Sequence, residues 1–184
     1  MNFIFGVLVG AAIMWGRLKI LRMSAKARAK EWDVGDYQNQ LRFIEQTQLY
    51  IRKPINKEAF KTVFIVAENA LASIRPKHRI LAEVSMGSFM GTSNAGVRKS
   101  ISVRAFKSFN SKRVDFLVID ASGKPKLAIE YHGSGHYQGN AEDRDAVKRF
   151  ALKKAGIPLL EISEGATKRE VENKVRYWIK NNSR

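Results

Sequence analysis

Two carboxylates lie inside apolar runs that are close together in the sequence. Asp115 interrupts the run 114–119, and Glu130 interrupts the run 127–131. A run that is apolar on both faces indicates a central strand, where an ionised carboxylate is costly unless it is paired or bound to a cation. Two such groups therefore predict a divalent-metal site, and their oxygen ligands favour Mg²⁺ or Mn²⁺.

The stretch between the two runs indicates how they pair. Residues 120–125 read Asp-Ala-Ser-Gly-Lys-Pro, a turn cluster, so the runs are predicted to form a hairpin. If Ser122-Gly123 is the turn, Asp115 stands directly opposite Glu130 on the same face, with β-carbons ~5 Å apart. Like charges at that spacing destabilise a sheet unless a cation lies between them.

Two histidines follow the second carboxylate. His132 is two residues after Glu130, so it is expected on the same face, and His136 lies in the Gly/Ser-containing loop beyond it. Such a cluster could bind a phosphate oxygen and activate a water. We therefore predict Asp115, Glu130, His132 and His136 as catalytic residues, with Asp115 and Glu130 also binding metal. The alternative is that Asp115 pairs with a basic neighbour and that both histidines are exposed loop residues.

The elements that would position these residues are predicted from hydrophobic periodicity and turn signals. Together they predict an α/β fold, a three-layer sandwich around a mixed sheet. The helix at 140–155 is expected to turn Val147, Phe150, Ala151 and Ala155 inward. The expected order is a helix capped by Asn56 and ended by Arg75-Pro76, a strand at 79–84, a Gly/Ser-rich loop at 85–100, the hairpin, the helix at 140–155, a strand at 157–162 parallel to the preceding one, and a helix at 168–181.

Other acidic residues could join the site. Glu58, in the first helix, is predicted as an accessory metal ligand, and Glu68 is the second candidate; both could equally be solvated. Asp143 and Asp145 are expected to act as capping and dipole partners at the start of their helix.

The chain is strongly basic, with 33 Lys and Arg against 17 Asp and Glu, a net charge of +16. Such an excess indicates a polyanionic partner, either nucleic acid or an anionic membrane surface. Lys107, Lys112 and Arg113, close to the predicted site, are expected to contact nucleic acid. No motif for reading bases is present. The absence of cysteine excludes disulfides and Cys-based zinc sites.

The N-terminal segment 1–22 is hydrophobic, with an uninterrupted apolar run at 3–15 that basic residues follow. Because Lys and Arg favour the cytoplasmic side, we predict a single-pass anchor in the inner (cytoplasmic) membrane, with the main domain in the cytoplasm. A full span needs ~20 residues, so a helix lying in the interface or a buried helix of a cytoplasmic protein remains open. Residues 23–53 are predicted as a basic, polar linker or helical stalk, and 54–184 as the main domain.

Four segments carry a family resemblance: 113–120, 128–136, 144–145 and 155–162. They resemble the bacterial DUF2726 family, which is similar in turn to Vsr mismatch endonucleases and DUF559 proteins of the PD-(D/E)XK nuclease superfamily. The resemblance covers about 54–165. It implies that Asp115 and Glu130 are the two acidic motif residues and that His132 stands where the pattern has a catalytic lysine. Vsr-type members use histidines in this region.

Together these features predict a membrane-tethered, Mg²⁺-dependent endonuclease that hydrolyses phosphodiester bonds in nucleic acid, with DNA the expected substrate. The competing hypothesis is a catalytically inactive nuclease-fold module that binds nucleic acid or acts as a scaffold at the membrane. Nothing in the sequence predicts the oligomeric state.

Overall fold

The structure, a computed structural model, describes the backbone of residues 2–75, 77–133 and 141–181, and their side chains except for 2–7, 9–12 and 141. The chain divides into two compact units, Met1–Arg52 and Lys53–Arg184. The predicted start of the main domain, at residue 54, differs from this division by one residue.

The first unit contains two helices, α1 (Asn2–Glu31) and α2 (Tyr37–Glu45). The side chain of Asp36 caps α2 by accepting hydrogen bonds from the backbone of Gln38 and Asn39. The Asn39 amide in turn donates to the carbonyl of Lys30 at 2.7 Å, which satisfies a group at the end of α1. The stretch predicted as a linker or stalk therefore contains the end of α1 and a capped second helix.

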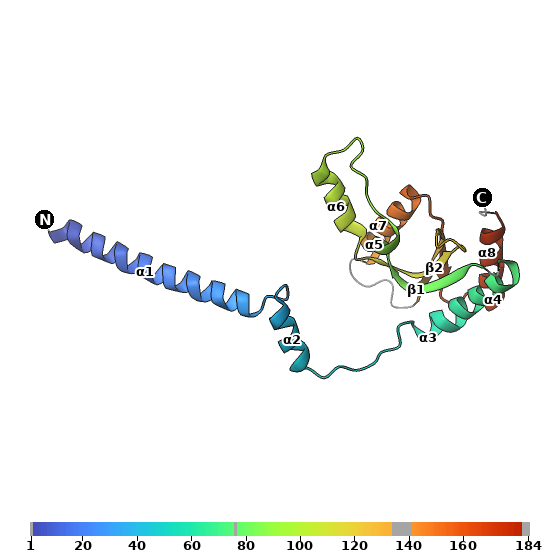
Figure 1. Cartoon of the computed structure of the whole chain (residues 1–184), viewed down its shortest axis with the longest axis horizontal. Coiled ribbons are helices and arrows are strands. Elements are labelled where there is room, and N and C mark those ends of the chain that lie inside the picture. The colour runs from blue at the N-terminus through green and yellow to red at the C-terminus, as the bar shows by residue number, and fades with distance from the viewer. Residues whose placement is uncertain (1, 76, 134–140, 182–184) are drawn as a thin grey trace. The chain divides into compact units, whose positions relative to one another are not determined.

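The segment predicted as a membrane anchor, 1–22, is helical over its described residues (Figure 1). When only the residues that the structure describes are considered, no helix is long and apolar enough to cross a membrane. Residues 3–7 and 9–12 of the apolar run lie outside that description. The predicted single-pass anchor is therefore not confirmed.

The second unit is built on a four-stranded mixed sheet. The first three strands are antiparallel neighbours, and the fourth runs parallel to the third, which confirms the predicted crossover. The strands lie in the order β1 (Arg79–Ser85), β2 (Arg113–Ile119), β3 (Pro125–His132) and β4 (Leu159–Ser163).

Helices pack against both faces of this sheet (Figure 1). One face is covered by a helical run that Asn56 caps, as predicted, and by α8; this run contains a wide π-helical turn, η1. Met86, Phe109 and Leu152 of three further helices cover the other face. The bounds are α3 (Lys57–Ala59), η1 (Phe60–Phe64), α4 (Ile65–Ile74) and α8 (Lys168–Asn181) on the first face, and α5 (Met86–Phe89), α6 (Lys99–Phe109) and α7 (Ala141–Lys154) on the second.

Two expectations for the second face were wrong. The stretch 85–100, expected to be loop, contains α5 and the first residues of α6. In α7, Phe150 is 70% exposed, whereas Leu152 is fully buried. The side of α7 that faces the sheet carries Asp145, Lys148 and Leu152, at helical spacings of three and four, so its polar residues were mistaken for a solvent face.

The hairpin of β2 and β3 has the predicted register. Phe116 pairs with Ile129, Leu117 with Ala128 and Val118 with Leu127, before the register shifts at Ile119. Continued by one step in the other direction, this register places Asp115 opposite Glu130. At the turn, the Asp120 carboxylate accepts hydrogen bonds from the backbone of Ser122 and Lys124, and Gly123 supplies the positive φ of 81°.

Candidate functional site

A pocket of about 650 Å³ lies where β2 begins and β3 ends. It combines acidic side chains, basic side chains and the start of two helical segments, α3 and α7. The residues that line it are Ile55, Asn56, Ala59, Glu83, Ser111, Lys112, Arg113, Asp115, Phe116, Tyr131, Gly133, Arg144, Asp145 and Lys148.

Asp115 is held in place by the neighbouring strand. Its Oδ2 accepts a hydrogen bond of 2.7 Å from the backbone N–H of Tyr131, the residue after Glu130. A carboxylate fixed by a backbone donor loses little freedom on binding a ligand, so Asp115 is preorganised at the pocket wall. Among the described residues, the hydrogen-bond partner of Asp115 is this N–H. The alternative interpretation expected an ion pair with an adjacent basic residue instead.

Glu130 does not itself line the pocket; it is buried, with 2% of its surface exposed, and two of its neighbours, Tyr131 and Lys148, do line it. Its Oε2 accepts a 2.7 Å hydrogen bond from Nζ of Lys148, whereas its Oε1 is buried and has no partner among the described residues. Burial and then the charge of Asp115 raise the pKa of Glu130 to about 7, against the opposing effect of Lys148. The hairpin register, continued by one residue, places the two carboxylates at neighbouring positions of adjacent strands.

Lys148 is on α7 and bridges two acidic residues, one on β3 and one on α7. Its ammonium lies 2.7 Å from Glu130 Oε2 and 3.2 Å from Asp145 Oδ1. Burial lowers the pKa of Lys148, but the two carboxylates more than offset it, so the net shift is upward and the side chain stays charged. Asp145, which was predicted as a capping and dipole partner of α7, thus also takes part in an ion pair.

Glu83 adds a third strand to the site. The pairs Ala82–Phe116 and Val84–Val114 on either side place it opposite Asp115. Its φ of 53° lies in the left-handed region that non-glycine residues rarely adopt, and such strain is common at functional sites. Burial and then Asp115 raise the pKa of Glu83, although Arg113 pairs with it at 4.0 Å.

The histidines are placed less centrally. Nε2 of His132 lies 2.9 Å from Oε1 of Glu161 on β4, and Arg149 also donates to this oxygen at 2.7 and 2.9 Å. His132 does not line the pocket, although it lies on the adjoining strand end. His136 lies outside the described residues.

The accessory carboxylates are also outside the centre of the pocket. Glu58 does not line the pocket, although burial and then the charge of Glu58 raise the pKa of Tyr131, which does line it; Glu68 is exposed on α4. Of the predicted nucleic-acid contacts, Lys112 and Arg113 line the pocket and Lys107 is exposed on α6. The structure therefore brings Asp115 and Glu130 together, with two of the three predicted phosphate contacts beside them.

The arrangement fits a divalent cation held by two side chains. Among the described residues, no group of three or more His, Asp and Glu side chains is placed to hold a metal ion. Asp115 and Glu130 nevertheless supply two neighbouring carboxylates, and Glu130 Oε1 lacks a partner. Mg²⁺ commonly binds to one or two carboxylates and completes its shell with water and substrate phosphates. The donor set fits that coordination.

Lys148 and Glu83 are the two site residues that sequence reasoning missed. A signal for Lys148 existed: it lies three residues after Asp145 and four before Leu152, so all three share one face of a helix. Glu83 stands inside the predicted strand 79–84, as Asp115 and Glu130 do in theirs, and the same argument from a buried carboxylate applied to it.

Comparisons with known proteins give the following matches. Residues 53–178 match a family described as "Protein of unknown function (DUF2726)". An uncharacterized protein of Haemophilus influenzae is 41% identical over 136 residues, which are 72% of this chain and 67% of that protein. The uncharacterized protein y4bI of Sinorhizobium fredii is 31% identical over 118 residues, 64% of this chain and 80% of that protein. No solved structure matches.

Proposed function

Because the chain belongs to the DUF2726 family, as its motifs predicted, we propose a function from the site itself: metal-dependent hydrolysis of phosphodiester bonds in nucleic acid. The proposal includes a PD-(D/E)XK-type role for the two acidic residues and DNA as the substrate. It requires a cation bound at the pocket and a phosphate brought to it by basic residues.

The observation that carries this proposal is the buried, unpartnered Oε1 of Glu130 beside Asp115. A carboxylate that burial and a like charge both disfavour costs stability in the absence of a compensating cation. Lys148 satisfies only Oε2. An oxygen left free next to a second fixed carboxylate is what a Mg²⁺ or Mn²⁺ site needs.

The roles of the side chains follow from their placement. Asp115 and Glu130 would hold the cation, which when bound supplies a polarised phosphoryl oxygen and an acidified water. Lys148, kept charged by its two carboxylate neighbours, would place a fixed positive charge where negative charge develops on the phosphate. Lys112 and Arg113 would bind the phosphates on either side. His132 is hydrogen-bonded to Glu161 and does not line the pocket.

The proposal is tested with the full-length protein and supercoiled plasmid. We expect Mg²⁺- or Mn²⁺-dependent nicking that falls at least 100-fold in Asp115→Asn and in Glu130→Gln, because each removes one of two metal ligands. Mn²⁺ binding, followed by electron paramagnetic resonance, should weaken in the same two variants. Glu172→Gln on α8, which loses a carboxylate paired with Arg176, is the matched control and should keep both properties.

Two outcomes would contradict the proposal. One is nicking by Asp115→Asn at the rate of Glu172→Gln, and the other is Mn²⁺ binding that neither site variant alters.

The second candidate is a nuclease-fold module that binds nucleic acid without cleaving it. What favours it is the pairing of His132 with Glu161, because the residue in the motif's lysine position is then engaged away from the pocket. The same plasmid experiment separates the two candidates, since this module would bind plasmid with strong salt dependence and leave it supercoiled at every Mg²⁺ concentration.

A further inference from the structure

One stretch of the second unit carries positive charge without any negative charge. From Met86 to Val114 the sequence contains no acidic residue. Glu83 lies shortly before this stretch and Asp115 directly after it. The stretch does contain six basic residues, which are Arg98, Lys99, Arg104, Lys107, Lys112 and Arg113. Six positive charges on a segment without carboxylates produce a locally positive surface, which is the electrostatic footprint of a polyanion site.

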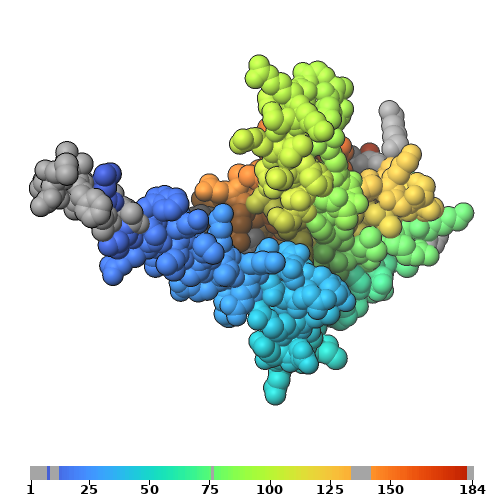
Figure 2. Space-filling view, turned by 60° about the vertical axis from the view of Figure 1, so that its left-hand side comes forward, coloured from blue at the N-terminus to red at the C-terminus, as the bar shows by residue number. Residues whose placement is uncertain are grey.

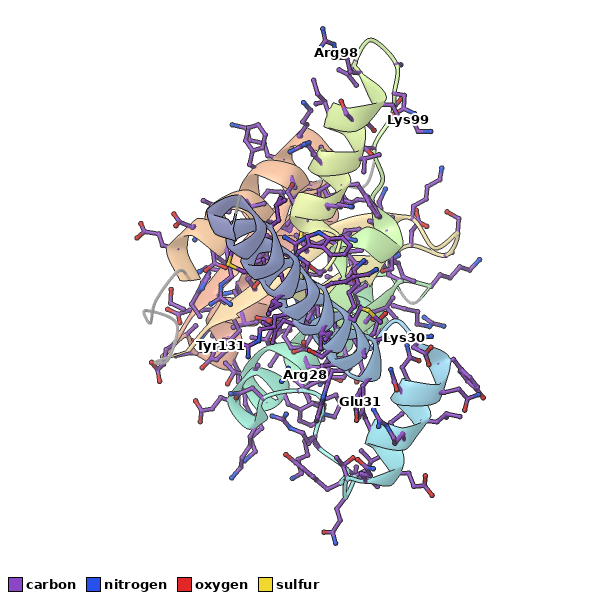
Figure 3. The ribbon with its side chains drawn as sticks, turned by 90° about the vertical axis from the view of Figure 1, so that its left-hand side faces the viewer. Arg28, Lys30, Glu31, Arg98, Lys99 and Tyr131 are labelled. Atoms are coloured by element: carbon purple, nitrogen blue, oxygen red, sulfur yellow. The ribbon has the colours of Figure 1, made fainter. Side chains whose placement is uncertain are left out.

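The stretch forms a projection from the sheet. In Figure 2 the region around α6 stands out from the rest of the second unit, and Figure 3 shows Arg98 and Lys99 at its far end. At the other end, Lys112 and Arg113 line the pocket. We call residues 98–113 the α6 arm. Its 11-residue helix is about 16 Å long, or roughly five phosphates along one strand of a duplex.

The outer face of the α6 arm is basic and its inner face is packed. Ser102 and Phe109 are buried, whereas Arg104 and Lys107 are exposed on the opposite side of α6 at a spacing of three. No ion pair joins Arg98, Lys99, Arg104 or Lys107 to a carboxylate within the part of the chain that the structure describes. Their charges are therefore available to a ligand.

The aromatic residues of the α6 arm are turned inward. Phe106 and Phe109 pack edge-to-face at 5.5 Å within the core between α6 and the sheet. Proteins that bind single strands usually present exposed aromatic rings on which bases stack. The arm instead offers charges and the exposed hydroxyl of Ser100, which are groups that contact phosphates.

We propose that the α6 arm binds the sugar–phosphate backbone of a nucleic-acid duplex and guides it to the pocket, without reading bases. The claim that the arm guides the duplex to the pocket rests on the proposed function. The claim that the arm binds the duplex does not, because the arm residues outside the pocket would contact phosphates alone. Affinity should therefore be separable from cleavage.

The test measures binding of a 20-base-pair duplex and of the matching single strand by the full-length protein, in a chelator and over a range of salt. We expect the duplex to bind more tightly. In a variant with Arg98, Lys99, Arg104 and Lys107 each changed to Gln, the slope of log affinity against log salt should fall by about 3.6, that is ~0.9 for each phosphate that the protein no longer neutralises. The preference for the duplex should fall with it.

The matched control removes four positive charges from the opposite face of the sheet, by changing Lys168, Arg169, Lys174 and Lys180 of α8 to Gln. It should keep the wild-type slope. An equal decrease in both variants, or tighter binding of the single strand, overturns the proposal. Because this binding is measured without metal, it does not depend on hydrolysis. If the plasmid were not nicked in Mg²⁺ or Mn²⁺ while this binding stayed intact, the result would count against the proposed hydrolysis and leave the arm assignment standing.

Discussion

At the scale of single residues, the burial of Glu130 beside Asp115 makes the stability of the second unit depend on pH. Glu130 has a pKa of about 7, well above the 4.5 of an ordinary glutamate. A carboxyl whose pKa is raised by folding holds its proton more tightly in the folded state. Its stabilising effect is complete below about pH 4.5 and is lost as the pH rises through about 7.

We therefore expect the free energy of unfolding to fall by about 2 kcal/mol more in the wild type than in Glu130→Gln between pH 5 and pH 8. Urea unfolding in a chelator measures both proteins at both pH values. Adding Mg²⁺ at pH 8 should restore part of the difference, because a bound cation favours the ionised form. Parallel pH profiles for the wild type and the variant would contradict the burial of a titrating Glu130.

The same pair shows how far the site could be predicted from the sequence. Asp115 and Glu130 were predictable because charges inside apolar runs are conspicuous and the turn cluster between the runs indicates a hairpin. The two-residue turn assumed for the register is not the one observed, since Ile119 pairs with Pro125, and a register shift beside it gives the predicted pairing from Val118 onward. Lys148 was not recognised because α7 was oriented by its apolar residues, and Phe150 was taken as inward-facing although it is 70% exposed. A helix that covers a charged site turns polar residues inward, so an argument from hydrophobicity alone orients it wrongly.

At the scale of elements, the base of the α6 arm depends on a close approach between two turns. A β-carbon on Gly87 would lie 2.9 Å from both the β-carbon and the carbonyl oxygen of Asn110. The N–H of Gly87 donates to that same carbonyl at 3.1 Å, and the Ser85 hydroxyl donates to it at 2.5 Å. The start of α5 and the turn after α6 are thus joined through Asn110.

Gly87→Ala should therefore destabilise the protein by about 1–3 kcal/mol, because the backbone of Asn110 has to move. Thermal unfolding of the full chain measures the change, with a fall in Tm of roughly 2–4 °C for each kcal/mol. Gly91→Ala is the matched control, since nothing lies within 4 Å of a β-carbon there. Similar Tm values for the two variants would show that the close approach at Asn110 has no energetic consequence.

Elements differed in how clearly the sequence specified them. The helix at 168–181 was predicted to its ends, because Val171, Val175 and Ile179 repeat at helical spacing and are all buried. In α6 the buried residues are Ser102 and Phe109, a serine and one aromatic, so no apolar stripe marked it as a helix. Because few residues of α6 pack against the sheet, its sequence shows little of the apolar periodicity from which a helix is predicted.

At the scale of the whole molecule, the two units have very different internal support. Both hydrophobic clusters belong to the second unit, whereas the described side chains of α2 include no buried residue. The segment that joins the units lies outside helix and strand, and Leu49, Tyr50 and Ile51 in it are at least 77% exposed. Proteases cut where a backbone can enter their active site without breaking packed structure.

Brief chymotrypsin treatment of the full-length protein should therefore cut after Tyr50 early and leave a fragment that begins at Ile51. Mass spectrometry of the time course identifies the first products. Since the sheet, the pocket and the α6 arm all lie beyond residue 53, the fragment should keep the salt-dependent binding of duplex that the full chain has. Early cuts inside β1 or β2, ahead of any product from Tyr50, would mean that the sheet opens more readily than the connecting segment. If removal of residues 1–50 abolished binding, the polyanion site would belong to α1, whose basic residues would then contribute more than those of the arm.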